Sequence, residues 1–75
     1  MPRFVIRSLG HHDLPPELSE ASDDDVEDVL RRAAAFLGRP HVDVERVASV
    51  IGCMPVIDVV ASVEGVPILV AQPAM

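Results

Sequence analysis

Three histidines and one cysteine are the side chains of this 75-residue chain best suited to metal or nucleophilic chemistry. His11-His12-Asp13, with His41 and Cys53, contains each side-chain type that a transition-metal site uses. The spacing fits no compact zinc motif, because the sequence has neither CxxC nor HxxxH. Adjacent histidines in a strand would also point to opposite sides. We therefore expect exposed loop histidines, with no metal and no other cofactor.

Catalysis by Cys53 would need a general base, and His41 is the candidate. Residues 52–55, Gly-Cys-Met-Pro, are typical of a turn and match no nucleophile motif. Asp24 and Asp28 share a helix face, but they belong to an exposed polar turn, whereas acid–base work by carboxyl groups usually needs burial. The four glycines are isolated, so the chain has no phosphate-binding loop. We expect a protein that is not an enzyme.

Acidic residues are concentrated in one block. The net charge is −6, all six basic residues are Arg, and eight of the twelve acids lie between residues 13 and 28 with no basic residue among them. Such a block either keeps the protein soluble or faces a basic partner, such as a nucleic-acid-binding protein. The candidate partner-binding residues are Asp13, Glu17, Glu20, Asp23, Asp24, Asp25, Glu27 and Asp28.

Composition and length exclude several classes of protein. A hydrophobic content of 49% argues against disorder, and no run approaches the roughly 20 apolar residues of a membrane span. The absence of Trp and Tyr, together with the acidity, argues against direct binding of nucleic acid. The N-terminus lacks the apolar segment of a signal peptide, so we expect a cytoplasmic protein. Residues 1–75 form one domain near the lower size limit, where oligomerisation commonly adds stability.

The first half of the chain predicts a strand, a loop and one helix. Residues 3–9 are rich in β-branched side chains, and residues 10–21 read as a loop in which Pro16 could start a short turn. A helix is expected over residues 23–37, capped by Ser22 and ended by Gly38. Its apolar stripe has three- and four-residue spacing. The stripe consists of Val26, Val29, Leu30, Ala33 and Leu37, and Glu27–Arg31 and Asp28–Arg32 are possible ion pairs.

The second half predicts a hairpin preceded by an ambiguous segment. Residues 42–51 fit a helix better than a strand, although the β-branched residues keep a strand open. Residues 56–63 and 66–71 form a hairpin about Glu64-Gly65, and residues 72–75 read as a tail. The fold class is therefore α+β: one main helix on a small, mostly antiparallel sheet, in the order β-α-(α or β)-β-β, ending in a β-hairpin.

Both faces of this hairpin are apolar, and one helix covers only one of them. We expect the helix stripe to pack on Ile57, Val59, Ala61 and Val63. The second apolar surface is an assembly surface that includes Val66, Ile68 and Val70. We expect a second copy of the chain or a larger partner to cover it, by pairing at a sheet edge or by packing of sheet on sheet.

The middle of the chain offers an alternative. Ala34, Gly38, Val44 and Val47 resemble the small residue, turn glycine and core positions of a helix-turn-helix unit, and a following hairpin resembles the end of a winged-helix domain. That resemblance implies a transcription regulator, but two acids would begin its recognition helix.

Taken together, these features favour a small acidic protein–protein interaction protein. It would be either a dimeric accessory or regulatory subunit, or an inhibitor that occupies a basic surface. Small acidic inhibitors of phage or mobile-element origin work in the second way, and the Ala/Val/Arg-rich composition is compatible with a GC-rich bacterial or phage genome.

Overall fold

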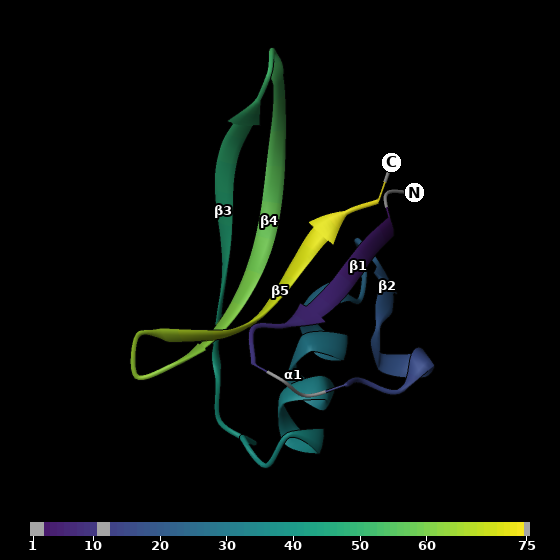
Figure 1. Ribbon diagram of the computed structural model, residues 1–75, viewed down its shortest axis with the longest axis vertical. Coiled ribbons are helices and arrows are strands. Elements are labelled where there is room, and N and C mark those ends of the chain that lie inside the picture. The colour runs from purple at the N-terminus through teal and green to yellow at the C-terminus, as the bar shows by residue number, and fades with distance from the viewer. Residues whose placement is uncertain (1–2, 11–12, 75) are drawn as a thin grey trace.

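One helix packs against one face of a five-stranded antiparallel sheet in the computed structural model, which describes residues 3–10 and 13–74 (Figure 1). The strand order is β2-β1-β5-β4-β3. This arrangement confirms the α+β prediction and the C-terminal hairpin. The elements are β1 (Arg3–Ser8), the short 3-10 helix η1 (Pro16–Leu18), β2 (Glu20–Ser22), α1 (Val26–Phe36), β3 (Asp43–Ile51), β4 (Met54–Val63) and β5 (Val66–Pro73).

The predicted loop and tail contain ordered structure that the sequence did not reveal. Pro16 begins η1, as expected, but Glu20–Ser22 forms a short strand beside β1 and buries Ala21. Gln72 and Pro73 belong to β5, which pairs with β1 as far as Phe4 opposite Pro73. The Ala74 N–H donates to the Arg3 carbonyl at 2.8 Å. The two ends of the described chain therefore lie side by side (Figure 1).

The helix begins three residues later than predicted. The Ser22 N–H and hydroxyl both donate to Asp25 Oδ1, at 3.0 and 2.9 Å, and residues 23–25 form a turn before Val26. Gly38 ends the helix as predicted, with a φ of 80°. Its N–H donates to the Ala35 carbonyl, and the next N–H donates to the Ala34 carbonyl, which is the Schellman arrangement.

The core lies between α1 and the centre of the sheet. Val26, Val29, Leu30 and Ala33 are buried, as the stripe predicted. They face Val59 and Ala61 of β4 as expected, with Leu69 and Ala71 of β5 and Phe4 and Ile6 of β1 in the same cluster. Leu37 and Val63 pack at its edge. Ile57 was wrongly placed in the core, because it lies beyond the reach of the helix and is 47% exposed.

Residues 43–51 form a strand, so the preference for a helix was wrong. All nine residues of β3 pair with β4, from Asp43 opposite Ser62 to Ile51 opposite Met54. The β-branched side chains suit this pleated pairing. The local sequence fits both a helix and a strand, and pairing with the distant strand β4 decides between them. Among the described residues α1 is the sole α-helix, so the helix-turn-helix resemblance, and the winged-helix arrangement built on it, are also wrong.

The two hairpins close with different two-residue turns. Glu64 and Gly65 have φ values of 51° and 81°, the pattern of a type I′ turn. Between β3 and β4 the turn is Gly52-Cys53, where only the glycine has a positive φ, as in type II′. β4 consequently begins at Met54, two residues before the predicted start.

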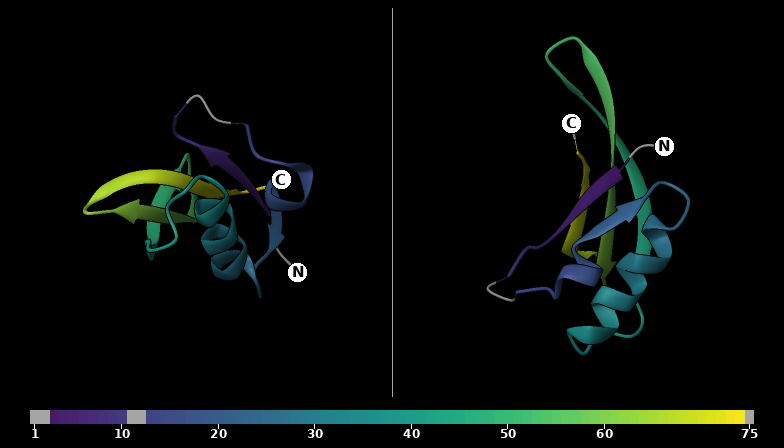
Figure 2. Two further views of the ribbon diagram at one scale, coloured as in Figure 1. Left: turned by 90° about the horizontal axis from the view of Figure 1, so that it is seen from below. Right: turned by 90° about the vertical axis from the view of Figure 1, so that its right-hand side faces the viewer.

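The β3–β4 hairpin projects away from the rest of the molecule (Figure 1). Pairing between β4 and β5 ends at Val59 opposite Ala71, whereas pairing between β3 and β4 continues to the turn. We call residues 47–58 the arm. The arm extends past α1 and past the end of β5, as the right-hand view of Figure 2 shows most clearly.

Candidate interaction surface

The arm carries most of the exposed large hydrophobic side chains. Five of the nine such residues among those described belong to it, although it is only a short part of the chain. They lie on both faces of the hairpin, because side chains alternate along a strand. The five are Val47, Val50, Ile51, Met54 and Ile57. The arm is therefore an apolar surface with two uncovered sides.

The change from buried to exposed occurs within one face of β4. Ala61, Val59 and Ile57 share the face that looks toward α1, since they are two residues apart with regular pairing. Val59 is 0% exposed and Ile57 is 47% exposed. Across from Pro55 on the same face, Val50 is 70% exposed. The sequence is equally apolar on both sides of this boundary, so the limit is set by where α1 and β5 end.

Two clefts lie where the arm leaves the body. One, of about 380 Å³, is lined by Phe4, Ile57 and Pro73, and also by the Asp23–Arg46 ion pair. A smaller cleft, of about 160 Å³, is lined by Ile51, Asp58 and Gln72, among others. Both include Val56 and Pro73, so they flank the place where β4 separates from β5. Apolar surface thus continues from the arm to its base.

The predicted assembly surface is less continuous than the arm. Val66 is exposed beside the 64–65 turn. Val70 is half-buried in the centre of the sheet, opposite Val60 and Arg7. Ile68 packs against the core, at a bulge where pairing shifts between Ala61 and Ser62. The three residues therefore do not form one exposed patch.

Most of the acidic block is engaged in local contacts. Asp23 and Glu27 pair with Arg46, Asp28 pairs with Arg32, and Glu20 pairs with Arg3. Asp25 accepts the two hydrogen bonds from Ser22. Asp13, Glu17 and Asp24 make no ion pair or side-chain hydrogen bond with any described residue. Of the eight acids in the block, only these three have no local side-chain partner among the described residues.

Arg46 is a residue whose role the sequence analysis missed. Its Nη1 lies 3.0 Å from Asp23 Oδ1, and its Nε lies 3.7 Å from Glu27 Oε1. Arg46 stands at the base of the arm, so these contacts join β3 to the start of α1. The expected Glu27–Arg31 pair does not form, and Asp28–Arg32, at 3.3 Å, does. The sequence alone does not show these contacts, because Arg46 comes close to Asp23 and Glu27 only when residues 43–51 form a strand.

The candidate nucleophile and base are far apart. Cys53 is exposed at the tip of the arm, and His41 precedes the base of β3. Nine residues of strand separate them, roughly 30 Å at about 3.3 Å per residue. His11 and His12 lie outside the described residues. Within residues 3–10 and 13–74, no three His, Cys, Asp or Glu side chains are grouped to hold a metal ion.

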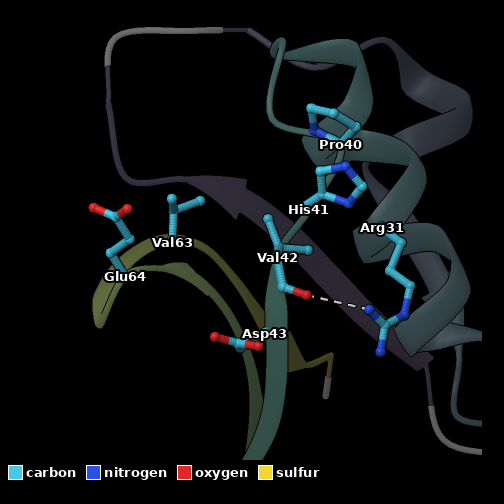
Figure 3. Close-up of a pocket in the computed structure, with 7 residues that line it drawn as sticks. All are labelled: Arg31, Pro40, His41, Val42, Asp43, Val63 and Glu64. Carbon is cyan, nitrogen blue, oxygen red and sulfur yellow. Dashed lines mark hydrogen bonds between the residues drawn. The ribbon is translucent and has the colours of Figure 1, made fainter.

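His41 lies beside a polar hollow of about 510 Å³ (Figure 3). Arg31 lines the same hollow, and its Nη1 donates to the Val42 carbonyl at 3.2 Å. Asp43 and Glu64 also line it, so it contains charges of both signs. The hollow lies at the end of β3 opposite the arm tip.

Comparison with protein-family models, with curated proteins and with solved structures gives no match. No helix in the described part of the chain has the length and apolar character that would let it span a membrane.

A pattern in the sequence indicates the apolar tip of the arm. Residues 50–57 read Val-Ile-Gly-Cys-Met-Pro-Val-Ile, which places apolar pairs on either side of a turn glycine. A hairpin there would leave its tip apolar whatever covered its base. The helix interpretation of 42–51 hid this pattern.

Proposed function

We propose that the chain is a non-enzymatic protein–protein interaction protein that binds through the arm. The observation that carries the proposal is the set of apolar side chains exposed on both faces of residues 47–58. Burial of each such side chain is worth about 1.5–3 kcal/mol when complete, so water is an unfavourable environment for the arm. Contiguous exposed apolar surface commonly marks an interaction site. A cytoplasmic location fits the unpaired, exposed thiol of Cys53.

Of the two ways in which such a protein could act, the accessory or regulatory subunit has more support. The inhibitor needs acids free to meet a basic partner, and four of the eight already pair with Arg side chains of the same chain. A carboxylate that pairs with its own Arg offers less charge to another protein. The role that fits the acids best is to keep a protein with an apolar arm in solution.

Affinity purification from the native host, with three variants in parallel, tests this proposal. Val50→Ser with Ile51→Ser should remove the bound protein, whether a partner or an untagged second copy. The matched control, Val66→Ser, changes a valine of similar exposure outside the arm, and this variant should retain the bound protein. The proposal is wrong if the arm variant keeps every bound protein.

A third variant separates the two modes of action. Asp13→Asn, Glu17→Gln and Asp24→Asn together remove the acids without local partners. Binding and its association rate should stay close to those of the unmodified chain. Slower association that added salt reproduces would instead support the inhibitor of a basic surface.

A further inference from the structure

The sheet has free edges, and they differ in how well they are protected. β2 is only three residues long, which leaves little backbone to pair with. The outer half of β4 contains Pro55, which has no N–H and hinders the addition of a strand on that side. β3 presents nine residues, with neither proline nor glycine, and its pairing with β4 has no bulge. Natural proteins seldom leave so long an edge open unless something pairs with it.

The charge pattern of β3 also permits pairing. Its charged residues are Asp43, Glu45 and Arg46, all in the half near the body. The half that belongs to the arm, Val-Ala-Ser-Val-Ile, is uncharged. Arg46 is already neutralised by Asp23 and Glu27. In an antiparallel pair of such edges, the charged end of each copy lies opposite the uncharged end of the other, so like charges stay apart.

We infer that β3 pairs antiparallel with β3 of a second copy, about a two-fold axis at Val47. The inference rests on the arm-binding function proposed above and names the partner. In the register that pairs all nine residues, Val47 faces its own copy and no two like charges are directly opposite. The other pairs are Asp43 with Ile51, Val44 with Val50, Glu45 with Ser49 and Arg46 with Ala48.

This register gives the exposed side chains on both faces of β3 a cross-strand neighbour in the second copy. Val50 of one copy comes beside Val44 of the other, and Val44 packs against the core. Ile51 comes beside Asp43 on the opposite face. Each exposed tip therefore meets the covered base of the other copy, and the two five-stranded sheets become one.

The hollow in Figure 3 lies where this register ends. Beyond this register, the turn residues Gly52 and Cys53 of one copy come close to Val42 and His41 of the other. His41 and Asp43 line the hollow of about 510 Å³, so the turn of the second arm would lie beside it. A second copy thus accounts for the open edge and gives the exposed β3 residues of the arm a neighbour.

Opposite charges at Val47 provide the sharpest test. Val47 is 44% exposed, so either charged side chain reaches solvent in a single copy, although Asp58 directly opposite in β4 favours Lys over Glu. Sedimentation velocity at tens of micromolar should find the unmodified chain dimeric. Val47→Lys and Val47→Glu should each weaken the dimer by at least about tenfold, because like charges then meet on the axis. An equimolar mixture of the two variants should form the dimer again, and that recovery also shows that both variants fold.

The control is Val5→Lys, which adds the same charge to an exposed valine in β1, away from β3. It should leave the dimer unchanged. A dimer lost in Val5→Lys but kept in Val47→Lys would overturn the inference in favour of face packing. A strictly monomeric unmodified chain would also overturn it. In that case, loss of a different bound protein by the Val50→Ser/Ile51→Ser variant would still support the proposed function.

A cysteine pair tests the register. With oxidised glutathione as oxidant, His41→Cys should give a covalent dimer through the partner's Cys53, whereas neither the unmodified chain nor His41→Cys with Cys53→Ser should give one. If the charge test supports the dimer but His41→Cys gives no covalent dimer, this register is wrong.

Discussion

The two halves of β4 have similar sequences and different surroundings. Residues 59–62 pair with β5 on one side and β3 on the other, and α1 covers one face of them. Met54–Asp58 pairs with β3 alone and is covered by neither helix nor strand. Both halves are rich in valine and isoleucine, yet Val59 is fully buried and Met54 is 61% exposed. Hydrophobic residues therefore build the core in one half and an exposed apolar surface in the other.

The difference follows from the lengths of the neighbouring elements. An 11-residue helix is about 16 Å long at 1.5 Å per residue, whereas the ten residues of β4 extend to roughly 33 Å. A helix of this size covers about half of such a strand. The uncovered half remains apolar, which is consistent with a site that another chain covers.

The largest expected effect comes from equivalent truncations in the body and in the arm. Leu69→Ala removes a fully buried side chain and should lower the free energy of unfolding by about 3 kcal/mol, a large share for a protein of this size. Ile51→Ala, at a residue that is 66% exposed, should change it by less than about 0.5 kcal/mol. Chemical denaturation over a dilution series measures both values. Equal losses at low concentration would show that the arm belongs to the folded core of the monomer.

The sequence predicted the body of the protein well because its signals are local. The apolar stripe of α1 repeats with helical period, Gly38 ends the helix, and Glu64-Gly65 marks the hairpin turn. Each of these signals needs only a few neighbouring residues. β2 escaped prediction because three residues are too few to show a period, and Ala21 is buried only because β1 lies beside it.

The arm could not be predicted in the same way. Residues 43–51 satisfy both helix and strand templates, and pairing with β4 decides between them. Whether Ile57 is buried depends on where α1 ends in space, which the residues around Ile57 do not encode. The acids were misleading for a similar reason, since Arg46 reaches Asp23 and Glu27 only after β3 has formed.

An intermediate effect is expected from the two turns. Gly65 and Gly52 both have positive φ, and a methyl group added to either would meet no atom within 4 Å, so the cost of alanine is conformational. Gly65→Ala should lower the global free energy of unfolding by about 1–2 kcal/mol, because β4–β5 pairing is part of the core. Gly52→Ala should lower it by less than about 0.5 kcal/mol, because the arm can open while the body stays folded.

Hydrogen exchange distinguishes local opening from global unfolding in these variants. In Gly52→Ala, amides of the arm should exchange faster while those of Val59–Val63 keep their rates. In Gly65→Ala, both groups should exchange faster together. Faster exchange throughout the sheet in Gly52→Ala would mean that the arm and body unfold as one unit.

The smallest effect tests the junction between arm and body. Arg46→Gln removes the ion pairs to Asp23 and Glu27, and Arg32→Gln removes only the pair to Asp28 on the same helix. Exposed pairs contribute up to about 1 kcal/mol, and pairs one helical turn apart contribute about 0.3–0.5 kcal/mol. Arg46→Gln should therefore cost more stability than Arg32→Gln at low salt, and the two costs should converge as salt screens the charges. Equal losses of stability at low salt would mean that the Arg46 ion pairs do not help to hold the arm at its junction with the body.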